Sequence, residues 1–308
     1  MSYRNICEMR ICGIKRSGNH AILGWIKKNQ PPPVVHFNDI SCGNPSPLPH
    51  TNRLQLKSAD PYRTFGAVNI RGLPFWKCKP KLTSLLKYLF ERPREMTFVR
   101  GDPKIRLNFI RACKKNTLIL SYENCFLDED IFHEFDSKHD QLVGKSKHRY
   151  EIVILRDAYN LFASLIKSGR AGAENVKQYI RLYKQYAREF LGLTNLSDRN
   201  DYRRILINFN QWFASSEYRA SILRKIGHST PEGTAYMRVP SEGGGSSFSG
   251  TMKTGNAAQL GVLERWKQLT GNPLYESVFQ DAELRELTDH TFELGLSGNP
   301  EEEISEPG

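Results

Sequence analysis

Apolar and polar positions along the chain repeat one pattern, in which a short apolar run is followed by a segment with apolar residues at helical spacing. The short runs predict strands at 9–14, 33–37, 67–70, 117–122, 151–155 and 204–209. Several runs, such as IVIL and LIL, are apolar without interruption. Such runs are typical of strands that a parallel sheet buries on both faces.

Amphipathic segments follow most of these strands. They predict helices at 19–28, 81–91, 158–167, 173–191, 216–226 and 257–269, and a short helical pair between about 274 and 294. Repeated strand-then-helix order indicates an α/β fold with a central, mainly parallel sheet flanked by helices.

Stretches that interrupt the strand-then-helix pattern indicate the domain organisation. A Pro-rich stretch at about 40–63 predicts an irregular surface excursion, and the GGGSS stretch within 227–259 predicts a loop. We find no repeat and no linker between two cores, so 1–297 is expected to form one domain. The acidic segment 298–308 is expected to be a disordered tail.

The net charge of the chain limits the classes of partner that we expect it to bind. The chain has 308 residues, 39% hydrophobic and 25% charged, with a formal net charge of +11 that is spread along its length. This balance predicts an anionic partner. Zinc-finger spacing and RNP-like aromatics are both missing, which favours an enzyme with an anion site over a nucleic-acid groove. No apolar run reaches 18 residues and charges come early, so we expect a cytoplasmic protein without membrane contact.

The six cysteines contain no C-x-x-C pair. Cys12, Cys113 and Cys125 lie in or beside apolar runs and are expected to be small buried residues, which indicates a reducing compartment. The histidines show no ligand spacing, and we predict no metal site.

The first strand runs into ICGIKRSGNHAILGWIKK, residues 11–28. Gly18 permits a tight turn, and the backbone N–H groups of 17–20 would stand at a helix N-terminus, where an anion is favoured. Lys15 and Arg16 add positive charge. Triphosphate-binding loops end in Lys-Ser/Thr, whereas Asn19 and His20 stand here, which disfavours a magnesium-dependent kinase. An ordinary turn with a surface Lys-Arg pair is the alternative.

A second strand-to-helix junction lies at EIVILRDAYNLFASLIKSG, residues 151–169. Arg156 ends the strand, and Asn160 and Ser164 share one helical stripe that can face it. An arginine fork beside a serine hydroxyl suits a phosphomonoester. The alternative is a terminal Arg-Asp pair and a solvent-facing serine.

Together these junctions resemble the sulfotransferases that use 3′-phosphoadenosine-5′-phosphosulfate (PAPS). That family has a first loop like P-K/R-S-G-T and a second like R-[DN]-P-x-[DN]-x-x-x-S, and the segments 205–227 and 243–266 resemble its later parts. Asn19 replaces the expected Thr, and Ala158 replaces the expected Pro. The resemblance implies a P-loop NTPase-like three-layer fold. It also implies PAPS as donor, adenosine 3′,5′-bisphosphate as product, and no required metal.

The resemblance assigns residues to the donor. The residues implied to bind it are Lys15, Arg16, Ser17, Gly18, Asn19 and His20 at the phosphosulfate, Arg156 and Ser164 at the 3′-phosphate, and Gly245, Ser246, Ser247 and Phe248 in a closing loop. Phe248 is favoured beside adenine, and for Trp212 or Phe213 core packing is the alternative.

The implied reaction moves a sulfuryl group to a hydroxyl or amine of a small molecule, such as a secondary metabolite. Arg16 would stabilise the leaving phosphate, and Lys15 is the second candidate for this role. Glu123, at a strand end, would be the general base. His20 and His36 remain alternative bases. Residues 39–116 are where acceptor pockets vary in the family. A magnesium-dependent P-loop kinase and a basic nucleic-acid-binding protein are the competing functions, and a homodimer stays open.

Overall fold

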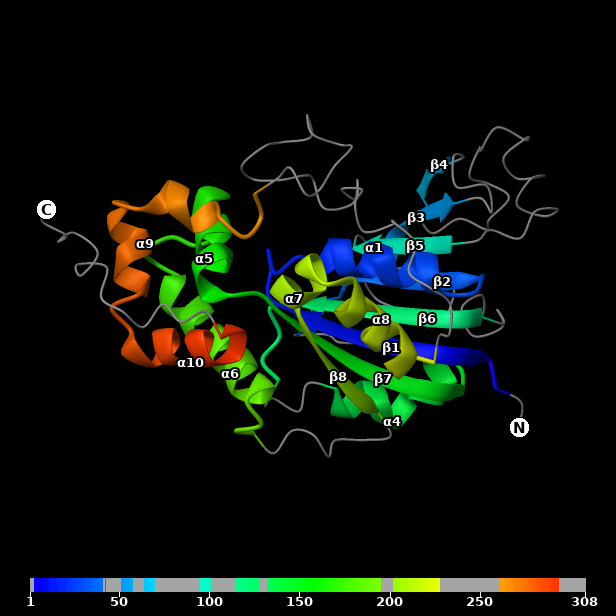
Figure 1. Cartoon of the computed structure of the whole chain (residues 1–308). Coiled ribbons are helices and arrows are strands. Elements are labelled where there is room, and N and C mark those ends of the chain that lie inside the picture. Colours follow the sequence, from blue (N-terminus) through cyan, green and yellow to red (C-terminus); the bar gives the residue numbers. More distant parts are fainter. Residues whose placement is uncertain are drawn as a thin grey trace, which may run out of the picture.

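The computed structural model describes residues 3–40, 42, 51–57, 64–69, 95–100, 115–127, 132–194, 202–227 and 261–293. They contain a sheet of strand order β4-β3-β5-β2-β6-β1-β7-β8 (Figure 1). The strands are β1 Asn5–Gly13, β2 Val34–Ile40, β3 Thr51–Lys57, β4 Thr64–Asn69, β5 Glu95–Arg100, β6 Lys115–Glu123, β7 Ser146–Leu155 and β8 Arg203–Asn208. Neighbours from β5 to β8 are parallel, while β3 is antiparallel to β4 and β5. The predicted, mainly parallel sheet is confirmed.

Helices cover both faces of this sheet. They are α1 Asn19–Asn29, α4 His133–Leu142, α5 Ala158–Lys167, α6 Val176–Phe190, α7 Phe209–Ala214, α8 Ser216–Lys225, α9 Pro273–Val278 and α10 Ala282–Phe292, with the 3₁₀ helix η6 Arg265–Leu269. One buried cluster joins the sheet to α1 and α8, and a second joins its other face to α5, α6 and α10. Beyond the carboxyl ends of the strands, α5, α6, α9 and α10 pack together (Figure 1). No helix in the described ranges is long and apolar enough to cross a membrane.

Some elements differ from the sequence prediction. β3 lies inside the stretch predicted to be irregular. Its sequence TNRLQLK has two apolar residues, so the apolar pattern did not indicate a strand there. Its strand form depends on pairing with β4 and β5. The strand β5 and the helices α4 and α7 were not predicted. In the predicted helix 257–269, the described part is helical only as η6. The predicted helix 81–91 lies outside the described residues.

Cys42 and Cys125 form a disulfide. Cys42 follows β2 and Cys125 follows β6, and these strands are neighbours in the sheet. Cys125 is buried, as predicted, but its pairing with Cys42 was not expected, because only the strand order brings the two residues together. The cysteine pattern no longer supports a reducing compartment, since structural disulfides are rare in the cytosol.

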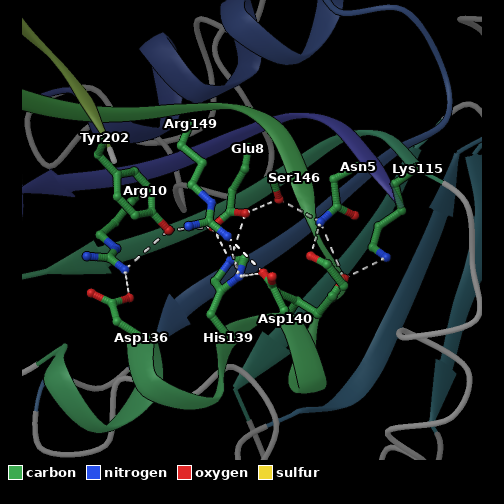
Figure 2. Close-up of polar contacts among 12 residues, drawn as sticks. Asn5, Glu8, Arg10, Lys115, Asp136, His139, Asp140, Ser146, Arg149 and Tyr202 are labelled. Carbon is green, nitrogen blue, oxygen red and sulfur yellow. Dashed lines mark hydrogen bonds and ion pairs between the residues drawn. The ribbon is translucent and has the colours of Figure 1, made fainter. Parts of the chain in front are cut away.

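A buried polar cluster lies on the α4 face of the sheet, at the end away from the strand carboxyl termini (Figure 2). We call it the Glu8 cluster; its members are Glu8, Arg10, Asp136, His139, Ser146 and Tyr202. Glu8 has no exposed surface and accepts hydrogen bonds from His139 Nε2 at 2.8 Å and from the Tyr202 hydroxyl at 2.6 Å, and also from Ser146. Arg10 pairs with Asp136 and lies over the Tyr202 ring. The cluster ties β1 to α4, β7 and the start of β8.

Candidate functional site

The carboxyl ends of three central, adjacent strands meet at one edge of the sheet. β1 is followed by the loop 14–18, β6 ends at Glu123, and β7 is followed by Arg156. Adjacent strands are about 5 Å apart, so these ends form one continuous surface. This edge is where α/β sheets bind their ligands.

The loop after β1 turns tightly into α1. The Ser17 N–H donates to the Ile14 carbonyl at 3.0 Å, and Gly18 caps the helix with a φ of 85°. Arg16 also has a positive φ, of 73°. The Ser17 hydroxyl is fully buried and has no hydrogen-bond partner among the described residues. The loop therefore places a buried hydroxyl donor, two cations and a helix N-terminus together, as an anion site requires.

The second junction brings Arg156 and Ser164 together. Arg156 is buried, and its Nη1 donates to the Ser164 hydroxyl at 3.2 Å and to the Arg16 carbonyl at 3.4 Å. Its Nη2 donates to the Val262 carbonyl. The Asp157 side chain accepts from the Asn160 N–H at 2.8 Å and caps α5, which fixes the direction of the helix. Arg156 thus connects the two junctions directly.

Arg265 is a further residue of this site, and the sequence analysis did not assign it. Its Nη1 donates to the Ser164 hydroxyl at 3.2 Å, so two guanidinium groups converge on one serine. Asn160 holds the segment that carries Arg265, because its side chain accepts from the Arg265 N–H at 2.8 Å and donates to the Leu263 carbonyl at 2.9 Å. The only sequence signal was an arginine within the LERW stretch, and its contact with α5 is long-range.

The arginines form a cluster of like charge. Burial lowers the pKa of Arg156 to about 9; Asp157 opposes this shift and Arg265 adds to it. Burial, and then repulsion from Arg16, lower the pKa of Arg265 to about 10. The pKa of Arg16 is also lowered, by burial and by Arg170, against the attraction of Glu123. Buried cations that repel one another are relieved when an anion binds between them.

The candidate bases are placed differently. Glu123 Oε1 accepts a hydrogen bond from Asn19 Nδ2 at 3.0 Å and lies 4.0 Å from His20 Nε2. His36 is buried and lies 3.1 Å from the Ser121 hydroxyl through its Nε2. The structure therefore brings Glu123, Asn19 and His20 together at the loop, and it keeps His36 within the sheet.

Of the other residues predicted to bind the donor, the structure describes Lys15 but not the predicted closing loop. Lys15 Nζ lies 3.8 Å from Asp39 Oδ1, so its charge is directed toward the end of β2. Gly245, Ser246, Ser247 and Phe248 lie outside the described residues.

An aromatic side chain that the sequence analysis did not assign, Phe209, covers the loop. The Arg156 guanidinium lies 5.3 Å from the centre of its ring, and Phe213 stacks on it at 6.1 Å. Trp212 is buried edge-on against Trp25 and belongs to the core. Phe209 is therefore the ring that contacts the loop, and both Phe213 and Trp212 pack against it.

Gly18 allows this close approach, and its replacement by alanine should cost about 2 to 4 kcal/mol of unfolding free energy. A Cβ there would lie 2.1 Å from Phe209 Cε2, in addition to the strain of the positive φ. Gly169 is a matched control, because its φ is 66° and no atom lies within 4 Å of a built Cβ. Gly169→Ala should lose only about 1 kcal/mol in urea denaturation. Equal losses in the two variants would contradict the steric role of Phe209.

No family model matches the sequence, and no curated protein matches it. Among solved structures, the chain is similar to the "Sulfotransferase Domain from the Synechococcus PCC 7002 Olefin Synthase", with a TM-score of 0.44 and 12% sequence identity over 94% of this chain and 95% of that chain.

Proposed function

We propose that this protein is a sulfotransferase that moves a sulfuryl group from PAPS to a hydroxyl or amine of a small-molecule acceptor. The observation that supports this most directly is the convergence of Arg156 and Arg265 on the Ser164 hydroxyl, beside the loop after β1. Two cations and a hydroxyl donor suit the dianionic oxygens of a phosphomonoester.

The two anion sites suit one ligand with two anionic ends. Arg156, Arg265 and Ser164 would hold the 3′-phosphate, and Ser17, Gly18 and the start of α1 would hold the phosphosulfate. Arg156 donates to the Arg16 carbonyl, so the sites are adjacent and a single ribose can bridge them. Phe213, which is half-buried and stacks on Phe209, offers ring surface for the adenine.

The residues of the loop supply what sulfuryl transfer needs. The acceptor loses a proton while the acceptor–sulfur bond forms, and the bond from sulfur to the 5′-phosphate oxygen breaks with its electron pair on that oxygen. Arg16 would stabilise this charge without a metal ion, and Lys15 is the alternative cation for the same role. The Lys-Ser/Thr pair with which a kinase loop reaches the terminal phosphates and magnesium is replaced here by Asn19 and His20, and the Asn19 amide donates to Glu123. This contact makes the alternative, a magnesium-dependent kinase, the weaker reading.

Thermal melts with three ligands test the proposal: adenosine 3′,5′-bisphosphate, ATP with magnesium, and duplex DNA. A ligand at 100 times its Kd stabilises the folded state by about 2.7 kcal/mol, which a melt detects. We expect the bisphosphate to raise Tm and the other two ligands to have little effect. Stabilisation by ATP and magnesium alone would indicate a kinase, and stabilisation by DNA alone a nucleic-acid-binding protein.

A further inference from the structure

Glu123 is held from the side of the loop. Asn19 Nδ2 donates both to Glu123 Oε1 at 3.0 Å and to the Ile14 carbonyl at 3.1 Å. Asn19 is itself confined, because a Cβ on Gly13 would come within 2.2 Å of its Oδ1. The carboxylate at the end of β6 is therefore fixed to the start of α1 by a buried amide.

His20 stands on the open side of the same carboxylate. Its Nε2 lies 4.0 Å from Glu123 Oε1, the oxygen that Asn19 also contacts. The side chain of His20 is 27% exposed and that of Glu123 is 14% exposed. The imidazole is thus the more accessible group, with the carboxylate behind it. Hydrogen bonds between catalytic groups are often long without substrate and shorten in the complex.

Arg16 is the cation whose charge interacts with this pair. Arg16, in the loop after β1, is attracted by Glu123 and repelled by Arg170, which follows α5. Lys15, from the same loop, is directed to Asp39 at the end of β2. A carboxylate that stands behind an imidazole is well suited to orient the ring and to stabilise its charged form.

We propose that His20 and Glu123 form one catalytic dyad, in which His20 is the general base and Glu123, held by Asn19, orients it. This inference rests on the proposed sulfotransferase function. His20 Nε2–H faces Glu123, and Nδ1 takes the proton of the acceptor as the acceptor–sulfur bond forms. The S–O bond to the 5′-phosphate breaks, and its electron pair stays on the phosphate oxygen. The imidazolium then releases its proton to solvent.

A double-mutant cycle tests the dyad. The variants are His20→Gln, Glu123→Gln and the double variant, and the readout is kcat for sulfate release from ³⁵S-labelled PAPS with water as acceptor. General bases contribute about 10²- to 10⁴-fold, so each single variant should lose a factor in that range. Because the two residues act as a unit, the double variant should be within about 3-fold of the weaker single variant.

Three results of this cycle would overturn the dyad. Multiplicative losses would mean independent roles, full activity of His20→Gln would leave Glu123 as the base, and full activity of Glu123→Gln would leave His20 without an orienting partner. His148→Gln is the matched control, because His148 is exposed on β7 and should keep wild-type kcat.

Chemical rescue identifies the base within the pair. Added imidazole should raise the turnover of His20→Ala at least about 10-fold and leave that of Glu123→Gln unchanged. Absence of rescue would overturn the assignment of His20. Glu123→Gln and His148→Gln should keep the wild-type affinity for adenosine 3′,5′-bisphosphate, measured by calorimetry. A wild-type protein that does not bind the bisphosphate would overturn the proposed function, whereas multiplicative losses of kcat with intact binding would overturn the dyad alone.

Discussion

Replacement of Arg156 by alanine should weaken the binding of adenosine 3′,5′-bisphosphate about 30- to 700-fold, as measured by calorimetry. This range corresponds to the loss of about 2 to 4 kcal/mol that follows removal of one partner of a buried, charge-assisted contact. Arg156→Lys should recover only part of the affinity, because an ammonium group cannot make the forked contact of a guanidinium.

The unliganded Arg156→Ala protein should keep most of its stability. Burial and the nearby Arg265 lower the pKa of Arg156 below its ordinary value, so its charged form costs stability in the folded protein until an anion binds. Removal of the charge relieves this cost and offsets the loss of the contacts with Val262 and Ser164.

Arg204 provides the opposite case as a control. It is paired with Glu151 and with Glu189, and despite burial these partners raise its pKa. Arg204→Ala should therefore lower the free energy of unfolding and leave the bisphosphate affinity unchanged. An Arg156→Ala protein that binds the bisphosphate as tightly as wild type would contradict the assignment of the 3′-phosphate site.

The local parts of this site could be predicted from the sequence. Arg156 and Ser164 are eight residues apart across one strand-to-helix junction, so helical spacing alone indicates that they can meet. The loop after β1 is likewise a local turn, with Gly18 at a positive φ. Strands such as β6 and β7 were predictable because they contain uninterrupted apolar runs, LIL and IVIL, as a sheet buried on both faces requires.

The long-range parts could not be predicted. Arg265 reaches Ser164 only because Asn160 holds a segment from near the end of the chain. Phe209 covers Gly18 because β8 lies two strands from β1 in the sheet. The sequence could name Glu123, His20 and His36 as bases, but only the strand and helix positions show which of them are neighbours.

The Glu8 cluster should be the most sensitive point for stability: Glu8→Gln should lower the free energy of unfolding by about 3 to 5 kcal/mol near pH 6. Burial alone would raise the pKa of Glu8, but hydrogen bonds from His139, Ser146 and Tyr202 outweigh it and the pKa is lowered. Burial would lower the pKa of His139, but Glu8 and Asp140 outweigh it and the pKa is raised. The variant leaves a buried imidazolium without its counter-charge.

These shifts give the pH dependence a definite sign. The contribution of Glu8 is fully present above its ordinary pKa of 4.5 and is lost as the pH falls through its lowered value. The contribution of His139 is fully present below its ordinary pKa of 6.5 and is lost as the pH rises through its raised value. The stability difference between wild type and Glu8→Gln/His139→Gln should therefore be largest between pH 4.5 and 6.5 and decrease on both sides.

Urea denaturation from pH 4 to 9 measures this difference. The double variant should be more stable than Glu8→Gln, because it removes the uncompensated charge as well as the pair. Glu264→Gln is the control, since Glu264 and its partner Lys267 are 67% and 58% exposed and such surface pairs contribute little. A difference that does not vary with pH would show that Glu8 and His139 are not a charged pair in the folded protein. The stability of the β1–α4 contact would then come from packing alone, with the Arg10–Asp136 pair as its remaining ionic contact.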